Sequence, residues 1–330
     1  MNKILVVGGA GYIGSHMVKM LLAAGRSVVT VDDFSTGHRR AVTGGEIVEG
    51  SIGEPALLRE VFNAHPFDGV MHFASHIAVG ESVSAPAKYY RNNVANTLAL
   101  ATAMVESGVR ALVFSSSAAV YGNPQYVPID ENHPKQPVNP YGRSKWMVEQ
   151  MLEDFDGAYG LKSIRLRYFN AAGADPEGEL GEHHDPETHL IPLALQVASG
   201  RRDALQLFGR DYDTPDGTCV RDYIHVNDLC QAHLLALNRL CDGGGSAAYN
   251  LGNGVGFSVR EVIDAVKKVT GKSLRVQDSP RRPGDPAVLL ADSRRARTEL
   301  AWAPRLGELE TMIEHAWRWE QKLSARGVAR

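Results

Sequence analysis

Two residues four positions apart, Tyr141 and Lys145, have the types and the spacing of a proton-transfer pair. A helix places residues at this spacing on one face, one turn apart, and Pro140 suits the first turn of such a helix. A free phenol has a pKa near ~10 and is a poor base at neutral pH, but a cation one turn away favours the phenolate. Taken alone, an exposed polar pair on a surface helix is the commoner explanation. The surrounding segments therefore decide the interpretation.

A glycine-rich turn near the N-terminus has the pattern of a dinucleotide-binding site. Apolar residues 3–7 predict a strand, and Gly8, Gly11 and Gly14 follow it. Apolar residues then recur with helical spacing as far as Gly25. Glycines let the backbone approach a pyrophosphate, and the first turn of the helix offers that anion free N–H groups and the positive end of its dipole.

The next predicted strand, residues 27–31, ends in Asp32. A carboxylate at this point accepts hydrogen bonds from a ribose 2′-hydroxyl and repels a 2′-phosphate, which favours NAD over NADP. The competing explanation is that Asp32 or Asp33 only caps a helix or a turn. The strand, turn and helix before it favour the cofactor role.

Strands and helices alternate through the first half of the chain. Strands are predicted at 46–49 and 69–73, and helices at 55–64 and between Pro86 and Ser107. This alternation is typical of a Rossmann-type doubly wound parallel sheet with helices on both faces. The pattern loosens after about residue 175. We therefore predict an NAD-binding domain at 1–175 and a smaller C-terminal α/β substrate lobe at 176–330.

Composition agrees with this α/β class. A chain of 330 residues, 44% hydrophobic, exceeds what one core usually holds. The formal charge of −3 gives no reason to expect nucleic acid as a partner. No apolar stretch approaches the roughly 20 residues that a membrane span needs, and the three cysteines suit a reducing compartment. The sequence thus predicts a soluble, cytoplasmic protein.

Several motifs together resemble the extended short-chain dehydrogenase/reductase family. The Gly-x-x-Gly-x-x-Gly turn is followed about 130 residues later by Tyr-x-x-x-Lys. Residues 112–122 look like that family's fifth strand and its serine loop, in which Ser117 would be the catalytic serine. Residues 168–170, 221–226 and 281–285 are similar to segments of the UDP-glucose 4-epimerases. The resemblance covers essentially the whole chain.

The resemblance implies a mechanism with NAD as cofactor and a UDP-hexose, UDP-glucose or UDP-galactose, as substrate. Tyr141, as phenolate, would take the proton of the sugar 4-hydroxyl while hydride leaves C4, and a 4-keto sugar would form. Lys145 would hold the phenolate charge, and Ser117 would bind the reacting oxygen. Return of the hydride to the opposite face inverts C4. The family also implies a homodimer and a chain that crosses back to the first lobe after residue 176.

Residue roles also follow from the resemblance. The implied NAD contacts are Gly8, Gly11, Tyr12, Ile13, Gly14, Asp32, Ser51, Ile52, Phe73, Ala74, Asn92, Ser115, Tyr141, Lys145 and Tyr168. The implied substrate contacts are Ser117, Tyr141, Asn170, His189, Leu190, Phe208, Arg221, Tyr223, Arg282, Asp285 and Leu289, the last at the border of the sugar pocket. Without the family, surface salt bridges are the commoner role for arginines such as Arg221 and Arg282.

Two alternatives remain open, whereas the residues argue against a third, dehydration. Sugar-nucleotide dehydratases of the same family carry an acidic pair directly after the catalytic serine, whereas this chain has Ala118 and Ala119, which cannot transfer a proton. A 4-epimerase of UDP-glucuronate, UDP-xylose, UDP-arabinose or UDP-N-acetylglucosamine would keep the same three catalytic residues. A non-catalytic NAD-sensing protein could share the fold.

Ser51 and Ile77 stand where the family usually has polar cofactor contacts, which predicts weaker NAD binding.

Residues 181–189, Gly-Glu-His-His-Asp-Pro-Glu-Thr-His, are rich in the residue types that bind zinc. His183 and His184 are adjacent and cannot readily converge on one ion. We therefore predict a solvated loop here and no metal site.

Overall fold

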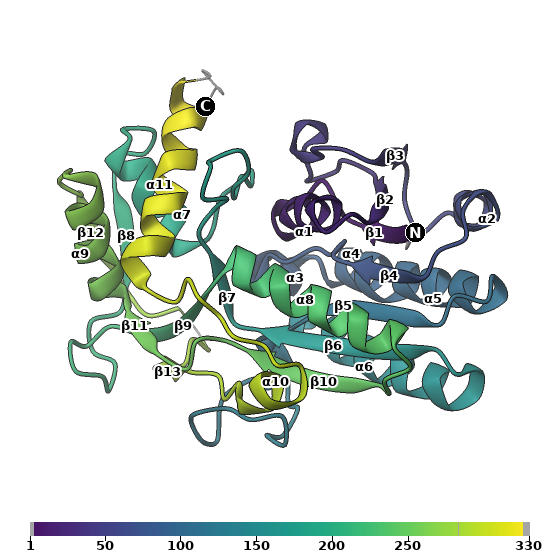
Figure 1. Cartoon of the computed structure of the whole chain (residues 1–330). Coiled ribbons are helices and arrows are strands. Elements are labelled where there is room, and N and C mark those ends of the chain that lie inside the picture. The colour runs from purple at the N-terminus through teal and green to yellow at the C-terminus, as the bar shows by residue number, and fades with distance from the viewer. Residues whose placement is uncertain (1–2, 283, 326–330) are drawn as a thin grey trace.

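The computed structural model describes residues 3–282 and 284–325 and has two lobes (Figure 1). Pro283, within one of the family-like segments, lies outside the described residues. The larger lobe is built on a seven-stranded sheet in the order β10-β6-β5-β4-β1-β2-β3, with every neighbouring pair parallel. Its strands are β1 (Lys3–Val7), β2 (Ser27–Asp32), β3 (Glu46–Glu49), β4 (Gly69–His72), β5 (Ala111–Ser117), β6 (Lys162–Tyr168) and β10 (Ala247–Leu251).

Helices cover both faces of this sheet. Side chains alternate along β1, so that Ile4 and Val6 pack in one apolar core while Leu5 and Val7 pack in another. The first core is closed by α1 (Tyr12–Ala23) and α8 (Val226–Cys241), and the second by α2 (Pro55–Ala64), α5 (Asn96–Glu106) and α6 (Pro140–Tyr159). The predicted doubly wound α/β fold is confirmed.

The helical stretch predicted between Pro86 and Ser107 is present, but it is not uniform. It consists of α4 (Pro86–Tyr89), a widened π turn at Tyr90–Ala95 and α5. Inside the widened turn, Asn93 Oδ1 accepts a hydrogen bond from His76 N (2.9 Å) and Nδ2 donates to Ser144 Oγ (3.0 Å). The irregular turn thus links the loop after β4 to α6. The short α3 (Val79–Ser84) precedes it, and single 3₁₀ turns occupy Arg39–Ala41 and Ala118–Val120.

The smaller lobe has two small sheets. In one, β9 (Val220–His225) pairs with β7, β11 and β13, and in the other β8 pairs with β12. The bounds are β7 (Asn170–Ala172), β8 (Leu205–Phe208), β11 (Gly256–Ser258), β12 (Val276–Ser279), β13 (Val288–Leu289), α7 (Leu190–Ala198), α9 (Val259–Thr270), α10 (Arg294–Glu299) and α11 (Leu309–Ala325). Helices α7, α9 and α11 lie in this lobe (Figure 1), and their side chains contribute to its apolar core.

The chain passes between the lobes more than once. Both α8 and β10 follow residue 175, yet they pack on and extend the seven-stranded sheet. The division of function at residue 175 therefore stays a prediction.

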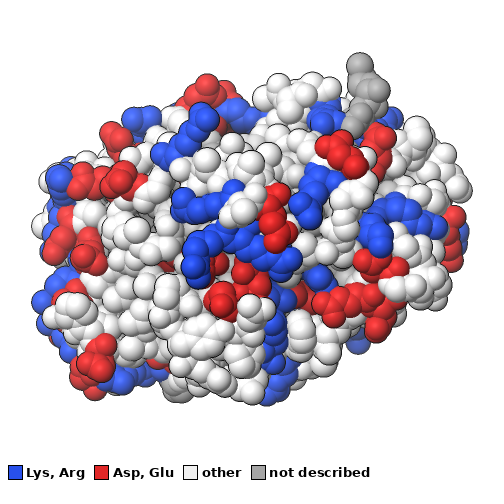
Figure 2. Space-filling model, turned by 60° about the horizontal axis from the view of Figure 1, so that its bottom comes forward, with Lys and Arg blue, Asp and Glu red and all other residues white. Residues whose placement is uncertain are grey.

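The surface carries mixed charge. On the face shown in Figure 2, acidic and basic side chains lie next to one another, and exposed ion pairs such as Arg281–Asp211 and Lys268–Glu310 are frequent. Among the described residues, no helix combines the length and apolar character that crossing a membrane requires.

A buried ion pair joins α6 to the sheet. The Arg167 side chain on β6 donates from Nε to Glu149 Oε1 (2.9 Å) and from Nη2 to Oε2 (2.5 Å), and the Glu149 side chain is fully buried. Ser116 Oγ on β5 donates to the same carboxylate (2.5 Å). One carboxylate thus ties α6 to two neighbouring strands directly below the Tyr141–Lys145 turn.

We expect Glu149→Gln to lower the free energy of unfolding by about 3 kcal/mol, because it leaves the Arg167 charge buried without a counter-ion. Urea denaturation measures the change. The matched control is Glu153→Gln: Glu153 also lies on α6 and pairs with an arginine of β6, Arg165, but its side chain is 56% exposed. An exposed pair contributes about 0 to 1 kcal/mol. Equal effects of the two substitutions would contradict the stabilising role of the buried pair.

Candidate active site

The predicted site residues of the larger lobe gather at the carboxyl edge of the parallel sheet. In register, Val7 lies beside His72, and Ser117 lies beside Tyr168. The residues that follow these strand ends, among them Gly8 and Phe73, therefore meet at one edge. Ligands of doubly wound sheets bind at this edge, where the strand order reverses.

The glycine turn between β1 and α1 needs glycine at two of its three positions. Gly8 adopts a φ of +80°, and a Cβ there would lie 2.4 Å from Ala74 N. A Cβ on Gly14 would lie 2.1 Å from Gly8 O. Gly11 is the N-cap of α1 and has no side chain to satisfy the N–H groups of the first turn. Those free donors and the close backbone approach fit the pyrophosphate of a dinucleotide.

Asp32 links the end of β2 to this turn. Its Oδ2 accepts from Ala10 N (2.9 Å) and its Oδ1 from Phe34 N (2.9 Å). Burial raises the pKa of Asp32, while the two backbone donors oppose that rise. A carboxylate has about four lone-pair positions, so acceptor capacity remains for a ribose hydroxyl.

The other predicted NAD contacts surround the same edge. Phe73 N and Ala74 N both donate to Val7 O, and Ser115 Oγ shares a hydrogen bond of 2.6 Å with Tyr168 OH. Tyr12 OH donates to Gly173 O (2.7 Å). Ile13 packs against the core beneath the turn, Ile52 is buried, and Ser51 and the half-exposed Asn92 lie in the first lobe.

Helix α6 begins where the sequence predicts and brings Tyr141 to Ser117. Asn139 caps it by accepting from Gly142 N at Oδ1 (2.9 Å), with Pro140 in the first turn. A Cβ on Gly142 would lie 2.5 Å from Ala119 O. Glycine at this position therefore allows the helix to contact the loop that follows Ser117.

Tyr141 and Lys145 are both buried, 9% and 4% exposed. Lys145 Nζ donates to Ser115 O (2.8 Å) and lies 6.0 Å from the centre of the Tyr141 ring. Burial raises the pKa of Tyr141, and a hydrogen bond with Ser117 partly offsets that rise. Burial lowers the pKa of Lys145 to about 7, against the opposing field of Glu149. The buried Lys145 ammonium has little negative charge nearby to balance it. A negative charge that develops on the Tyr141 phenol therefore stabilises it.

Glu149 is a further residue of this site that was not predicted. Its carboxylate is the charge that counteracts the lowering of the Lys145 pKa, and it holds α6 against the sheet. The signal was present, because Tyr141, Lys145 and Glu149 are spaced four apart and share one helix face.

The predicted substrate contacts lie in the smaller lobe and its borders. Arg221 forms an ion pair with Asp285, and the Arg282 guanidinium stacks 4.0 Å from the centre of the Phe208 ring. Arg282 and Asp285 border a surface pocket of about 650 Å³. Of the other predicted substrate contacts, Asn170 donates from Nδ2 to Asp222 O (2.9 Å), and Tyr223 is buried. Leu190 is the first residue of α7, and Leu289 packs beside Val120 and Tyr121.

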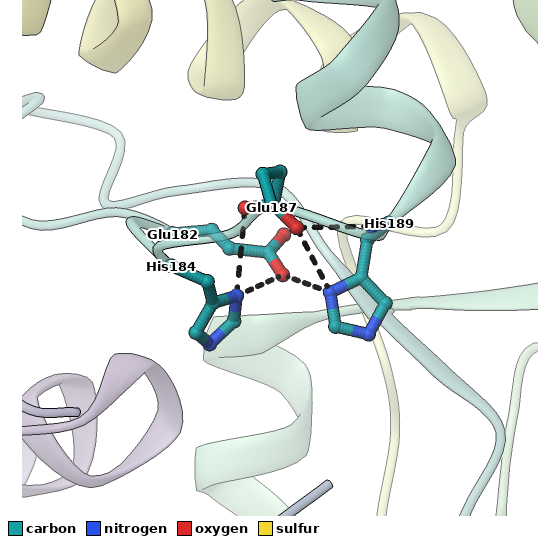
Figure 3. A group of neighbouring side chains, drawn as sticks. All are labelled: Glu182, His184, Glu187 and His189. Carbon is teal, nitrogen blue, oxygen red and sulfur yellow. Dashed lines mark hydrogen bonds and ion pairs between the residues drawn. The ribbon is translucent and has the colours of Figure 1, made fainter. Parts of the chain in front are cut away.

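The predicted solvated loop at 181–189 is wrong. Two of its members, Glu182 and Glu187, have buried carboxylates, and these lie between the rings of His184 and His189 (Figure 3). Adjacent histidines indeed diverge: His183 turns away and stacks on His38 at 4.3 Å. The prediction failed because it considered only the adjacent histidines. The side chains that come together are those of Glu182, His184, Glu187 and His189, which are two to seven positions apart and meet because the chain folds back on itself. His189 has Nδ1 2.6 Å from Glu182 Oε1, and its contact with substrate stays a prediction.

Comparison with known proteins places these features in a family. Residues 4–252 match the model of the NAD dependent epimerase/dehydratase family. A UDP-glucose 4-epimerase of Halalkalibacterium halodurans is 51% identical over 319 residues, which are 97% of this chain and 96% of the relative.

Solved structures agree. The UDP-glucose 4-epimerase of Brucella ovis in complex with NAD is 50% identical, with a TM-score of 0.94 over 96% of this chain and 98% of that one. The UDP-glucose-4-epimerase of Stenotrophomonas maltophila, with bound NAD and formylated UDP-arabinopyranose, is 41% identical, with a TM-score of 0.95 over 99% of this chain and 100% of that one. The glycine turn, the parallel sheet and the Tyr141–Lys145 helix are the family's features in this chain. The chain is therefore a member of the NAD dependent epimerase/dehydratase family.

Proposed function

We propose that this protein is an NAD-dependent epimerase that interconverts UDP-glucose and UDP-galactose by inverting C4 of the sugar. The observation that carries the proposal is the convergence of Ser117, Tyr141 and Lys145 at the carboxyl edge of the sheet, next to the glycine turn. The relatives at about half identity over nearly the whole chain bear the same activity in their names.

The chain's own groups account for the proton steps. Bound NAD would supply a hydride acceptor at C4 and return the hydride to the 4-keto sugar. Tyr141 takes the proton of the 4-hydroxyl and later gives it back, and the Ser117 hydroxyl, which lies next to the phenol, binds the reacting oxygen. Lys145 compensates the phenolate charge in a site from which burial excludes water.

The substrate contacts form a second part of the proposal. Arg221 and Arg282 have the planar donor geometry that matches a diphosphate. Arg282 stacks on Phe208, which leaves the edge of its guanidinium for an anion, whereas Arg221 must exchange or share its Asp285 partner. A homodimer and a cytoplasmic location complete the proposal.

The activity is tested by incubating the purified protein with UDP-galactose, UDP-glucuronate, UDP-arabinose and UDP-N-acetylglucosamine and separating the products by chromatography. We expect conversion of UDP-galactose to UDP-glucose, and NAD rather than NADP in the denatured extract.

Tyr141→Phe should lose roughly 10² to 10⁴ in rate while it still binds NAD and UDP-sugar, because only the proton acceptor is removed. Half of the wild-type turnover in this variant would exclude Tyr141 as the base.

The buried Lys145 predicts a pH-dependent difference in stability between the wild type and Lys145→Met. The lysine pKa is about 7 in the folded protein and near 10.5 in the unfolded chain, so the unfolded chain binds more protons between these values. The free energy of unfolding of the wild type should therefore rise relative to the variant from pH 7 to pH 10, by at most about 1.4 kcal/mol per pH unit. Urea denaturation of both cofactor-free proteins measures this. If the difference in unfolding free energy between the wild type and Lys145→Met stayed constant from pH 7 to pH 10, the pKa of Lys145 would not be lowered by burial.

Leu289 predicts the breadth of substrate use. Its side chain packs beside Val120 and Tyr121, which follow the Ser117 loop. We expect weak activity of the wild type on UDP-N-acetylglucosamine and a gain of about tenfold in kcat/KM in Leu289→Ala, because removing volume makes room for the acetamido group. An unchanged or lower kcat/KM in a folded Leu289→Ala variant would exclude Leu289 from the pocket border.

A further inference from the structure

Four side chains of the segment between β7 and α7 converge on one point (Figure 3). Glu182, His184, Glu187 and His189 each direct one ligand-type atom inward, and these atoms lie within 4.8 Å of one another. Both carboxylates are buried, with Glu182 at 6% and Glu187 at 3% side-chain exposure. The group lies outside the Tyr141 site, and His184 lines a pocket together with Gly11 and Tyr12 of the glycine turn.

Three of the four nitrogen–oxygen separations have the values of a tetrahedral coordination shell, and the fourth is shorter. His184 Nδ1 lies 3.2 Å from Glu182 Oε1 and 3.4 Å from Glu187 Oε2. His189 Nδ1 lies 3.3 Å from Glu187 Oε1 and 2.6 Å from Glu182 Oε1. Four ligands at the usual Zn–N and Zn–O distances of about 2.0 to 2.2 Å stand about 3.3 Å apart in a tetrahedron.

The two ring nitrogens are buried and aimed inward, yet they make no hydrogen bond. Both Nδ1 atoms lack solvent contact and a partner of hydrogen-bond geometry, although carboxylate oxygens lie close by. A protonated imidazole that paired with a carboxylate would point its N–H bond at an oxygen. Here each ring instead directs its nitrogen at the space between the carboxylates (Figure 3).

We propose that Glu182, His184, Glu187 and His189 form a structural zinc site. Two imidazoles and two carboxylates are ligands that zinc accepts, and four protein ligands complete a closed tetrahedral shell. The charges also agree, because two buried carboxylates balance one divalent ion while both imidazoles stay neutral. Hard cations such as Mg²⁺ prefer all-oxygen sites, so the two nitrogen ligands argue against them.

The competing arrangement is a metal-free ion-pair cluster with both histidines charged. Burial opposes the charge on His184 and His189, but the two carboxylates outweigh it and raise the pKa of His184 to about 9 and of His189 to about 10. Charge balance alone therefore permits either arrangement. The direction of the Nδ1 atoms and the 3.2 to 3.4 Å separations of three of the four nitrogen–oxygen pairs favour the ion.

The position of the site indicates what the ion would hold. His189 is the N-cap of α7, and the ring of His184 lies 6.5 Å from that of Tyr12, in the first turn of α1. Trp319 Nε1 on α11 donates to Glu182 O (2.9 Å). A zinc ion would therefore fasten the segment that joins the NAD-side turn of one lobe to two helices of the other.

The first measurement is the metal content of the full-length protein, expressed in zinc-supplemented medium and purified without chelator. We expect about one zinc per chain by plasma mass spectrometry, and a lower melting temperature after treatment with dipicolinate, restored by Zn²⁺, because ligand binding to the folded state stabilises it. Cobalt(II) added to the stripped protein should give the visible absorption of a tetrahedral site. These readouts do not depend on epimerisation, so they separate this proposal from the proposed function.

Variants locate the ion. His184→Ala and Glu187→Gln should each reduce zinc to below about a tenth per chain and abolish the chelator effect. His183→Ala is the matched control: it removes a neighbouring imidazole that faces His38 instead, and should retain the zinc. Less than about a tenth of zinc in the wild type, with no cobalt spectrum and no response to chelator, would overturn the proposal, as would zinc that stays bound in folded His184→Ala and Glu187→Gln.

Discussion

The buried pair of Glu149 and Arg167 is the interaction on which the catalytic geometry depends. It closes a chain of hydrogen bonds: Arg167 Nη1 donates to Tyr121 OH (2.9 Å), whose hydroxyl donates to Asn250 Oδ1 (2.6 Å) on β10. The network therefore holds α6, β5, β6 and β10 in one arrangement. Since a buried charge without a partner is costly, the helix that carries Tyr141 and Lys145 cannot shift along the sheet without breaking it.

The fixed position of α6 explains how Tyr141 and Lys145, whose charged forms are each opposed by burial, can stabilise each other. Burial opposes the phenolate of Tyr141 and the ammonium of Lys145 separately. Held on one helix face, each charge offsets the other's cost, so in the proposed reaction proton transfer to Tyr141 would be coupled to the presence of Lys145. Gly142 contributes by its lack of a side chain, because only glycine lets α6 approach the backbone at Ala119.

The connection between the lobes has its own anchors. Tyr12 OH donates to Gly173 O (2.7 Å), and Lys19 Nζ on α1 pairs with Asp175, Glu177 and Glu179. The acidic cluster around Lys19 is thereby accounted for as an ion-pair network. The histidine and glutamate group lies on the same crossover, so contacts of the glycine-turn helix with residues 173–189 link the cofactor side of the molecule to α7.

The sequence alone determined the elements whose signals are local. The alternation of strands and helices, the glycine turn, Asp32 at the end of β2 and the Asn139–Pro140 start of α6 all follow from short-range periodicity and capping. Tertiary structure decided what depends on distant segments. Glu149 became a buried ion only because Arg167 and Ser116 lie opposite it. Residues 182–189 have no period, so only their folding against Trp319 and Tyr12 brings the four ligand-type side chains together.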